Sequence, residues 1–408
     1  MVLYGNRLTD NTIMCKIVYM ITRKIEDELK IISKEFPIIA VLGPRQAGKS
    51  TLVKMFYKNY DYISFEDPDI RERVLEDPRS FLIKYPKCII YDEIQRVPSF
   101  LSYLQTHVDS GIEPGMIIIT GSHNYLLMES ISQSLAGRVG IVKLLPLSYS
   151  EIGLFNKQTM EETVFKGSYP GLYNRNIRPV SFFGEYLETY IERDVRLIKN
   201  ILSYDTFSLF LRILAGRTGQ ILNLKSIADD CGISSNTIKS WISVLETSFI
   251  VYRLKPYYKN YKKQIIKNPK IFFYDTGLVC FLLGIRSVEQ LETHYLRGSI
   301  IETFLISEFI KASYNRNIPL NFYYWRNNHQ KEIDLIIDDG KMHAFEMKSS
   351  KTIRREYFKT LNFWQELTHT PSSSCTLVYA GEENDLYSNM QVLSWNSIDE
   401  YFLKTFCI

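Results

Sequence analysis

The segment from Gly43 to Ser50 constrains the fold of this chain more than any other. It reads Gly43-Pro44-Arg45-Gln46-Ala47-Gly48-Lys49-Ser50, with glycine at the first and sixth positions and then lysine and serine. Glycine permits the tight turn that points backbone N–H groups at a polyphosphate. An apolar run of strand length, Ile38–Leu42, precedes the segment, and Thr51–Phe56 reads as a helix. Strand, loop and helix in this order predict a phosphate cradle at the N-terminal end of the helix.

The side chains of this loop predict ATP, bound as its Mg²⁺ complex, as the ligand. Lys49 can reach the β- and γ-phosphates, and the Ser50 hydroxyl can bind Mg²⁺. We expect the nucleotide contacts to come from Gly43, Pro44, Arg45, Gln46, Ala47, Gly48, Lys49, Ser50 and Thr51. The alternative is a chance match to the pattern in an unrelated loop, which the flanking strand and helix make less attractive.

A second acidic signal follows at Cys88–Glu93, where an apolar strand ends in Asp92 and Glu93. Asp92 is predicted to hold Mg²⁺ through water, opposite Ser50. Glu93 is predicted to orient or deprotonate the attacking water. Alone, the pair would read as an ordinary solvated acidic turn. Because it follows a phosphate-binding loop, the two motifs together predict a site of phosphoryl transfer.

Strand-like runs that alternate with helical patterns predict the fold of the first part. The runs are Ile38–Leu42, Tyr62–Phe65, Cys88–Tyr91, Met116–Thr120 and Gly140–Leu145. This alternation is typical of an α/β fold with a doubly wound parallel sheet. Ligands of such sheets bind at the carboxyl ends of the strands.

Three further residues are candidates for contact with the γ-phosphate. Ser122 follows the run Met116–Thr120 and is our first choice for a sensor, with Asn124 second; a plain turn explains both equally well. Arg138 ends the run Leu135-Ala136-Gly137-Arg138, which we place close to the carboxyl edge of the sheet. It is a candidate arginine finger, and a surface salt bridge is the alternative.

Together these residues resemble the AAA+ ATPases. The resemblance is closer to a bacterial and archaeal family of predicted AAA+ ATPases whose C-terminal half is a domain of unknown function. The features that carry it are Gly43–Ser50, Asp92-Glu93-Ile94-Gln95, Thr120-Gly121-Ser122, and Leu135–Arg138 leading to Pro146-Leu147-Ser148. The resemblance implies ATP hydrolysis in a homo-oligomeric ring, with Arg138 acting in trans on a neighbouring subunit.

The middle of the chain, residues 156–290, is predicted to be helical. Apolar residues at spacings of three and four predict a packed amphipathic helix over Pro179–Lys199. Residues 221–270 look like a winged helix-turn-helix whose second helix presents Asn236, Lys239, Ser240 and Ser243 to DNA. A basic, aromatic segment then suits a phosphate backbone, with Lys255, Tyr257, Tyr258, Lys259, Tyr261, Lys262, Lys263, Lys267 and Lys270. A winged helix that only packs against its neighbours is the alternative.

Residues 291–408 are predicted to form an α/β domain with a second acidic site. Helix Gly298–Ser313 is followed by strands Asn321–Trp325, Glu332–Ile337 and Met342–Met347, helix Arg355–Leu367 and strand Thr376–Ala380. A hairpin turn at Asp338-Asp339-Gly340 would bring Asp334, Glu346 and Lys348 to one end of the sheet. Carboxylate oxygens suit Mg²⁺ or Mn²⁺, and Lys348 could orient the attacking water.

This pattern resembles the core of the PD-(D/E)xK nucleases, a restriction-endonuclease-like fold. Asp334, Glu346, Lys348 and Glu302 stand at the motif positions, with Glu302, Asp334 and Glu346 as metal ligands. The sequence departs from the family at Ile333, where proline is usual. Surface salt bridges explain each residue separately, although they do not explain the order of helices and strands.

Bulk properties set the remaining limits. A chain of 408 residues predicts two or three domains, which we place at 20–155, 156–290 and 291–408. Residues 1–19 are a tail, or an annotation artefact if Met20 is the true start. The six cysteines are scattered, as expected for cytoplasmic thiols. No apolar run approaches the ~20 residues of a membrane helix, and the net charge of +4 permits nucleic acid as a partner.

The function predicted from the sequence is ATP hydrolysis by an AAA+ protein that associates with DNA and carries a metal-dependent, nuclease-like C-terminal domain. The alternative is a nucleotide-dependent switch or scaffold, in which the nuclease fold is vestigial and the partners are proteins.

Overall fold

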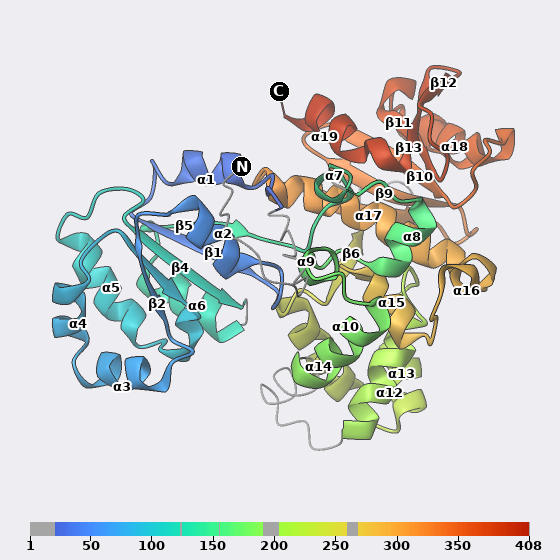
Figure 1. Cartoon of the computed structure of the whole chain (residues 1–408). Coiled ribbons are helices and arrows are strands. Elements are labelled where there is room, and N and C mark those ends of the chain that lie inside the picture. Colours follow the sequence, from blue (N-terminus) through green and yellow to red (C-terminus); the bar gives the residue numbers. More distant parts are fainter. Residues whose placement is uncertain (1–20, 123–124, 155, 191–203, 259–267, 408) are drawn as a thin grey trace, which may run out of the picture.

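The structure of the protein is a computed structural model that describes residues 21–122, 125–154, 156–190, 204–258 and 268–407. The predicted tail at 1–19, Asn124 and the lysines and tyrosine between 259 and 267 lie outside these ranges. Two β-sheets organise the described residues. Figure 1 shows the five-stranded sheet on the left, the helices α12 to α14 at the lower right and the C-terminal strands at the upper right.

The first sheet is the predicted doubly wound parallel sheet. Its strands follow the order β2-β3-β4-β1-β5, and all neighbouring strands are parallel. They are β1 (Ile38–Gly43), β2 (Asp61–Ser64), β3 (Ile89–Asp92), β4 (Ile117–Ser122) and β5 (Val139–Lys143). The accompanying helices are α1 (Glu26–Ile32), α2 (Lys49–Phe56), α3 (Pro68–Glu76), α4 (Pro78–Lys84), α5 (Phe100–Asp109) and α6 (Tyr125–Ser134), with a 3-10 turn η1 (Ile94–Arg96).

The inner strand β1 is apolar throughout because helices cover both faces of the sheet. Ile38, Ala40 and Leu42 pack into one core cluster with side chains of α3, α4, α5 and α6. Ile39 and Val41 point to the opposite face and pack with α1 and α2. Alternate side chains of a strand point to opposite faces, so a strand buried on both sides needs an unbroken apolar run.

The middle of the chain is mainly helical. Its elements are α8 (Met160–Lys166), α9 (Pro170–Asn174), α10 (Pro179–Tyr186), α12 (Tyr204–Ala215), α13 (Leu224–Cys231), α14 (Ser235–Thr247), β6 (Val251–Pro256), β7 (Lys270–Phe273), α15 (Thr276–Leu282) and α16 (Val288–Thr293). Helix α7 (Tyr149–Ile152) lies just before them. Helix α10 is the first part of the helix predicted over Pro179–Lys199, and residues 191–199 lie outside the described ranges.

Helices α13 and α14 are joined by a short turn and followed by a two-stranded antiparallel pair, β6 and β7. Gly232 ends α13 in the left-handed region at φ 68°, a conformation that glycine adopts without strain. Ser234 caps α14 by accepting a hydrogen bond from the backbone N–H of Thr237. These local signals explain why the predicted pair of helices forms here.

The C-terminal part contains α17 (Arg297–Asn315), β8 (Asn321–Arg326), β9 (Glu332–Asp338), β10 (Met342–Lys348), α18 (Lys359–Thr368), β11 (Cys375–Tyr379), β12 (Asp385–Tyr387), β13 (Met390–Ser394) and α19 (Ile398–Phe406). Three 3-10 turns, η3 (Arg355–Phe358), η4 (Ser372–Ser374) and η5 (Trp395–Ser397), connect them. Strands β8, β9 and β10 are antiparallel neighbours, and β10 pairs in parallel with β11. The helices and strands predicted here are present, while β12, β13 and α19 were not predicted.

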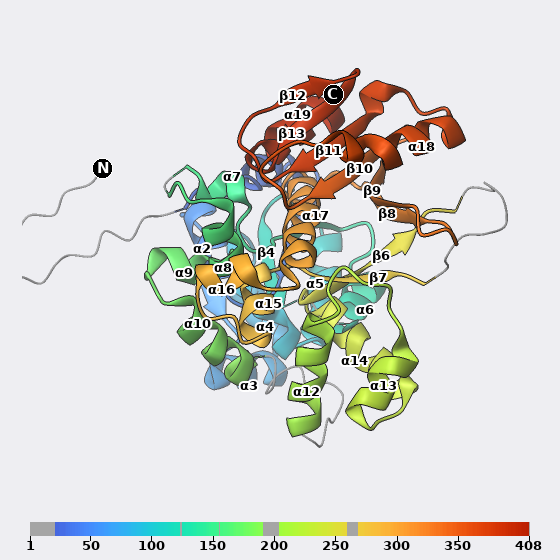
Figure 2. The ribbon, with the colours of Figure 1, turned by 90° about the vertical axis from the view of Figure 1, so that its right-hand side faces the viewer.

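The second sheet extends beyond the C-terminal part. Its eight strands follow the order β12-β13-β11-β10-β9-β8-β6-β7. Strand β6 pairs in parallel with β8 through Lys255–Tyr323 and Pro256–Tyr324, and Figure 2 shows the two strands side by side. The backbone N–H of Tyr257 then donates to the carbonyl of Tyr324 at 2.7 Å. One continuous sheet therefore contains strands from both sides of the domain limit predicted near residue 290. The domain limits stay a prediction.

This shared sheet corrects part of the predicted DNA-binding segment. Lys255 and Tyr258 are exposed, but Tyr257 is buried and Lys270 is only 3% exposed. Buried side chains cannot contact a phosphate backbone, so the assignment of Tyr257 and Lys270 to a basic surface was wrong. No local pattern indicates these contacts, because the pairing of β6 with β8 and the ion pairs of Lys270 with Glu302 and Glu332 join segments that are far apart in the chain.

Candidate functional site

The loop from Gly43 to Ser50 connects β1 to α2 at the carboxyl edge of the parallel sheet. A Cβ atom on Gly43 would lie 2.1 Å from the carbonyl oxygen of Leu144, so the close approach of the two segments requires glycine. Gly48 has φ 94° and Gln46 has φ 61°, and these left-handed residues turn the chain back towards the helix. The loop thus has the backbone conformation that the motif predicts.

Lys49 lies within the loop rather than in solvent. Its Nζ donates to the carbonyl oxygens of Gly43 at 3.0 Å and Pro44 at 2.9 Å. Burial lowers the pKa of Lys49 to about 8, although the charges of Glu93 and Asp92 oppose this shift. An anionic phosphate in the loop would favour the charged ammonium group, as expected for a phosphate-binding lysine.

Asp92 is held at the end of β3 by neutral hydroxyl groups. Ser50 Oγ donates to Asp92 Oδ1 at 2.8 Å, and the Tyr62 hydroxyl donates to Oδ2 at 2.6 Å. Thr120 also donates to this carboxylate. Ser50 and Asp92 therefore meet as predicted, and their oxygens are the ligand type that Mg²⁺ prefers. Tyr62 and Thr120 were not predicted; both lie on strands that flank β3 in the sheet.

Glu93 follows β3 in a left-handed conformation, with φ 59°. Such a conformation is strained for a residue other than glycine, and strain of this kind gathers at functional sites. The side-chain amide of Gln95 donates to the Glu93 carboxylate and, at 3.0 Å, to Ser122 Oγ. Ser122 lies opposite Gly43 in the pairing of β4 with β1. The predicted base and the predicted sensor are thus joined through one glutamine beside the loop.

A cavity of about 360 Å³ opens above the loop and is bordered by Glu93, Lys49 and Ser50. Its far side is formed by the middle of the chain, through Pro170, Gly171, Asn174 and Arg175. This volume is within the range of small-molecule sites. Nothing in the sequence indicated that α9 covers the loop, and Arg175 adds an unpredicted cation to the lining.

Arg23 was also missed, and it joins the loop to the segments that follow the sheet. Its guanidinium group is buried and donates to Ala47 O at 2.9 Å and Leu145 O at 2.7 Å. A third bond, at 3.0 Å, goes to the carboxylate of Glu151, which is fully buried. Arg23 precedes α1, where no sequence pattern connected it with the phosphate loop.

The structure places Arg138 at the amino edge of the sheet, so the predicted position near the carboxyl edge was wrong. Arg138 immediately precedes β5, and Val139 pairs with Ile38, the first residue of β1. A residue that precedes a strand in a parallel sheet lies at the edge opposite the phosphate loop. Its guanidinium pairs with Asp109 at 2.6 Å. Arg138 is therefore remote from the loop of its own chain, and its action in trans stays a prediction.

The C-terminal acids also lie close together. Two residues that were not predicted for this site, Glu332 and Lys270, lie among them. Carboxylate oxygens of Glu302 on α17 and of Glu332 and Asp334 on β9 all lie within 4.8 Å of one another. Lys270 Nζ, from β7, contacts Glu302 Oε1 at 3.0 Å and also the Glu332 carboxylate. We name Glu302, Glu332, Asp334 and Glu346 the carboxylate cluster.

Glu346 and Lys348 complete the surroundings of the carboxylate cluster. They form an ion pair with each other on β10. Asp334 Oδ2 accepts a hydrogen bond from the Met347 backbone N–H at 2.7 Å, which fixes β9 against β10 at this end. The predicted hairpin and the predicted group of Asp334, Glu346 and Lys348 are thus present, and Glu332 is an additional acid.

Burial and mutual repulsion shift the ionisation of these acids. Burial raises the pKa of Glu302 to about 7, against the effect of the Lys270 charge. Burial and the neighbouring Asp334 raise the pKa of Glu346 to about 8. Burial lowers the pKa of Lys348, but the charges of Asp334 and Glu346 outweigh it and leave the pKa raised. These are the shifts expected where several carboxylates share one partly buried position.

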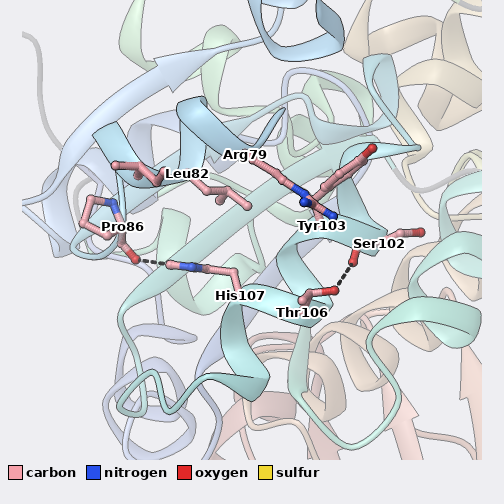
Figure 3. Close-up of a pocket in the computed structure, with 8 residues that line it drawn as sticks. Arg79, Leu82, Pro86, Ser102, Tyr103, Thr106 and His107 are labelled. Atoms are coloured by element: carbon pink, nitrogen blue, oxygen red, sulfur yellow. Dashed lines mark hydrogen bonds between the residues drawn. The ribbon is translucent and has the colours of Figure 1, made fainter. Parts of the chain in front are cut away.

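A cavity of about 600 Å³ between α4 and α5 is separate from both sites. Figure 3 shows Leu82, Pro86 and Tyr103 along its wall, and the His107 ring in contact with the Pro86 carbonyl oxygen at 2.7 Å. The described residues that line it include none of the predicted catalytic or metal-binding residues. No helix among the described residues is both long and apolar enough to cross a bilayer.

Comparison with known families divides the chain into three matched segments. Residues 35–153 match a family described as an AAA domain. Residues 157–289 and 297–398 match two families described as domains of unknown function, DUF8612 and DUF4143.

Two curated relatives have no assigned function. An uncharacterized protein of Mycobacterium tuberculosis is 28% identical over 378 residues, which are 89% of this chain and 82% of the relative. An uncharacterized protein of Haemophilus influenzae is 23% identical over 337 residues, or 73% of this chain and 81% of the relative.

Among solved structures, the Walker-type ATPase PABY2304 of Pyrococcus abyssi is 15% identical, with a TM-score of 0.38 over 64% of this chain and 94% of the other. A variant of RuvB from Thermotoga maritima is 15% identical, with a TM-score of 0.29 over 56% and 88%. The family match covers the five-stranded sheet, the phosphate loop and the Asp92-Glu93 pair. The chain therefore contains an AAA-type, nucleotide-binding ATPase domain.

Proposed function

We propose that the Gly43–Ser50 loop hydrolyses ATP bound as its Mg²⁺ complex, with Glu93 as the general base. One observation carries this proposal: Asp92 and Glu93 end the strand beside the loop, where the Ser50 hydroxyl donates to Asp92 and Lys49 lies buried between the loop carbonyls. The site combines a phosphate cradle, two oxygen ligands for a divalent ion and a second carboxylate for proton transfer.

Each residue then has a defined role. Lys49 binds phosphate oxygens, and Ser50 with Asp92 holds Mg²⁺, which neutralises charge on the phosphates when bound. Glu93 orients a water molecule and accepts its proton as the water oxygen attacks the γ-phosphorus. The bond between the γ-phosphorus and the bridging oxygen breaks, and ADP leaves with that oxygen. Gln95 holds Glu93 and Ser122 in register, so that Ser122 can respond to the γ-phosphate.

The ATP cycle would act on the rest of the chain through α9. Because Pro170, Gly171, Asn174 and Arg175 line the same cavity as the loop, a bound nucleotide would contact both the ATPase domain and the middle region. Arg23 also connects the loop backbone to Glu151 of α7, a helix that lies just before the middle region. These contacts support a mechanism in which nucleotide state sets the position of the middle region.

The middle region is proposed to be a DNA-associated winged helix formed by α13, α14, β6 and β7. Its second helix exposes Asn236, Lys239 and Ser243, as a helix that reads a groove would. The C-terminal part is proposed to be a nuclease-like domain in which Glu302, Asp334 and Glu346 hold Mg²⁺ or Mn²⁺ and Lys348 orients water. Oxygens of Glu302 and Asp334 lie within 4.8 Å of each other and of a Glu332 oxygen, a spacing that fits such an ion.

A second candidate function keeps the ATPase but not the cleavage. A nucleotide-dependent switch with protein partners would need the nuclease fold only as a scaffold. The contact of Lys270 with Glu302 and Glu332 favours this candidate, because an ammonium group already lies in the carboxylate cluster.

ATP turnover with and without DNA, run beside a cleavage assay in Mg²⁺ and Mn²⁺, tests the proposal. We expect Glu93→Gln to bind ATP and to turn it over at least ~100-fold more slowly. Glu72→Gln, on the exposed face of α3, is the matched control and should behave as the wild type. Wild-type turnover no faster than that of Glu93→Gln, with ATP bound, would contradict ATP hydrolysis at this site.

The proposed ring requires a complementation test. Arg138→Ala and Glu93→Gln each lack one half of a shared active site if Arg138 acts on a neighbour. Mixed in equal amounts, the two inactive variants should regain part of the wild-type turnover. A monomer by light scattering in the presence of ATP would end the proposal of action in trans.

A further inference from the structure

Lys270 is a buried lysine that the proposed function leaves without a role. It begins β7, on the hairpin that follows α14, yet its ammonium group reaches the carboxylate cluster of the C-terminal part. Its side chain is only 3% exposed and contacts Glu302 Oε1 at 3.0 Å, and it also contacts Glu332. These are two of the three acids whose oxygens converge within 4.8 Å. Lys270 thus lies where a cation shared by these acids would lie.

An independent observation shows that Lys270 does not satisfy the cluster fully. Glu346 is 6% exposed, and its Oε2 has no hydrogen-bond partner among the described residues. A buried carboxylate oxygen without a partner is costly, and such oxygens commonly mark an absent ion or water. The acids therefore offer at least one ligand oxygen that no surrounding cation in the described part of the chain uses.

The other cations around the cluster sit at its rim. Lys348 pairs with Glu346 and is 28% exposed, and Arg326 contacts Glu332 Oε2 at 3.2 Å with a side chain also 28% exposed. Four carboxylates thus face three cations among the described residues, of which Lys270 is the most deeply buried. The central position belongs to Lys270, and the rim positions belong to Lys348 and Arg326.

We propose that the Lys270 ammonium group is a tethered cation that fills the divalent-metal position of the carboxylate cluster, so that Mn²⁺ or Mg²⁺ binds there only after Lys270 withdraws. This inference rests on the proposed nuclease-like site. A metal ion that bound the Glu302 oxygen of the proposed site would lie close to the Lys270 nitrogen, because that nitrogen is 3.0 Å from Glu302 Oε1. Two cations this close in a partly buried site repel each other strongly, so the two states exclude one another.

The position of Lys270 in the fold couples metal binding to the hairpin of β6 and β7. Strand β7 pairs with β6, and β6 follows closely after α14 in the chain. Any movement of this hairpin relative to α17 and β9 would change the distance between Lys270 and its acids. Metal binding in the C-terminal part is therefore coupled to the state of the proposed winged helix.

Mn²⁺ titration of nucleotide-free protein, followed by electron paramagnetic resonance, tests the proposal. All proteins carry Asp92→Asn, which removes the carboxylate charge from the ATP site and so weakens Mn²⁺ binding there. We expect Lys270→Met to bind one Mn²⁺ per chain at least tenfold more tightly than the parent protein. The added site should disappear in Lys270→Met with Asp334→Asn.

Lys348→Met is the matched control, because it removes the same charge from the rim of the same cluster. We expect a smaller gain in Mn²⁺ affinity than Lys270→Met gives. An equal gain would show that total charge, not the position of Lys270, controls binding, and it would overturn the proposal. So would a Lys270→Met protein that gains no Mn²⁺ site.

The readout separates this inference from the function on which it rests. If the parent protein already binds Mn²⁺ as tightly as Lys270→Met, the proposal of a tethered cation is wrong, but the proposal of a nuclease-like metal site still stands. If Lys270→Met does not fold, Lys270→Gln replaces it, with thermal unfolding as the measurement. Mn²⁺ should then raise the midpoint by several degrees in the variant and not in the parent, because a ligand stabilises only a state that binds it. Equal midpoint shifts would contradict the proposal.

Discussion

The ATP site and the carboxylate cluster both combine acidic side chains with a lysine, but they partner the acids in opposite ways. Asp92 receives hydrogen bonds from the hydroxyls of Ser50, Tyr62 and Thr120, and Lys49 donates to backbone carbonyls. In the cluster, Lys270 contacts Glu302 and Glu332 directly. Neutral donors hold a carboxylate in place and leave its charge uncancelled. An ammonium group holds the carboxylate and also cancels its charge.

This difference indicates what each site is ready to bind. In the proposed ATP site, the Asp92 carboxylate would remain available for a divalent ion and the buried Lys49 for phosphate. The cluster has most of its charge neutralised by internal partners, although Glu346 keeps one buried oxygen without a partner among the described residues. Acids with a lysine nearby are therefore not one kind of site, and the partners of each acid decide what can bind.

The largest effect should be the loss of ATP turnover when the charge of Lys49 is removed. The same change at Lys348 gives the comparison. We expect Lys49→Ala to lower turnover roughly 100-fold or more, because a phosphate-binding group is lost from a water-poor site. Lys348→Ala, in the other acidic site, should leave turnover within about twofold of the wild type, since it lies outside the ATP site. Turnover by Lys49→Ala above about one tenth of the wild-type rate would show that the loop is not the catalytic phosphate site.

The next effect concerns stability and compares Lys270 with Lys348. Lys270→Met should lower the free energy of unfolding by about 3 kcal/mol, because breaking a buried ion pair leaves its acids uncompensated. Lys348→Met should cost less, since Lys348 is 28% exposed. Urea unfolding in the presence of a chelator measures both. Adding Glu302→Gln to Lys270→Met should recover part of the loss, and equal stability of the two single variants would refute the assignment of the central position to Lys270.

The comparison also explains what the sequence could predict. The ATP site is formed by segments that carry their own signals, such as the glycines at Gly43 and Gly48 and the acids at the end of an apolar strand. Parallel strands then bring these segments to one edge without further information. Asp334, Glu346 and Lys348 were predictable for a similar reason, because a hairpin turn fixes the pairing of β9 with β10.

Lys270, Arg23 and Arg175 were not predictable because tertiary contacts alone give them their positions. The pattern of lysines and tyrosines assigned Lys270 to a basic surface segment, but the fold buries it against Glu302 of α17 and Glu332 of β9. Arg175 reaches the ATP cavity because α9 packs over a loop that lies far earlier in the chain. The misplacement of Arg138 had a simpler cause, since the residues before a strand were assigned to the wrong edge of the sheet.

A smaller effect should come from one hydroxyl group of the ATP site. Tyr62→Phe removes the hydrogen bond to Asp92 Oδ2 and leaves the other two donors. One hydrogen bond to a charged group contributes about 1.5 kcal/mol, so the Mg²⁺ concentration for half-maximal turnover should change by roughly tenfold or less. Tyr60→Phe is the matched control, because the Tyr60 hydroxyl donates to Gly115 O at the opposite end of the sheet. Equal effects of both substitutions would contradict a role for Tyr62 in holding Asp92.

The smallest effect is expected for Asp109→Asn, which we compare with Asp92→Asn at the opposite edge of the sheet. Asp92→Asn and Asp109→Asn remove the same charge, but Asp92 lies at the carboxyl edge and Asp109 pairs with Arg138 at the amino edge. We expect Asp109→Asn to leave the unfolding midpoint unchanged, because exposed ion pairs contribute little. ATP turnover should stay at or slightly above the wild-type rate, since the substitution releases Arg138 without removing it. A loss of turnover comparable to that of Asp92→Asn would mean that the Asp109–Arg138 pair itself is needed, and that Arg138 acts by holding the ATPase fold rather than by reaching a neighbouring site.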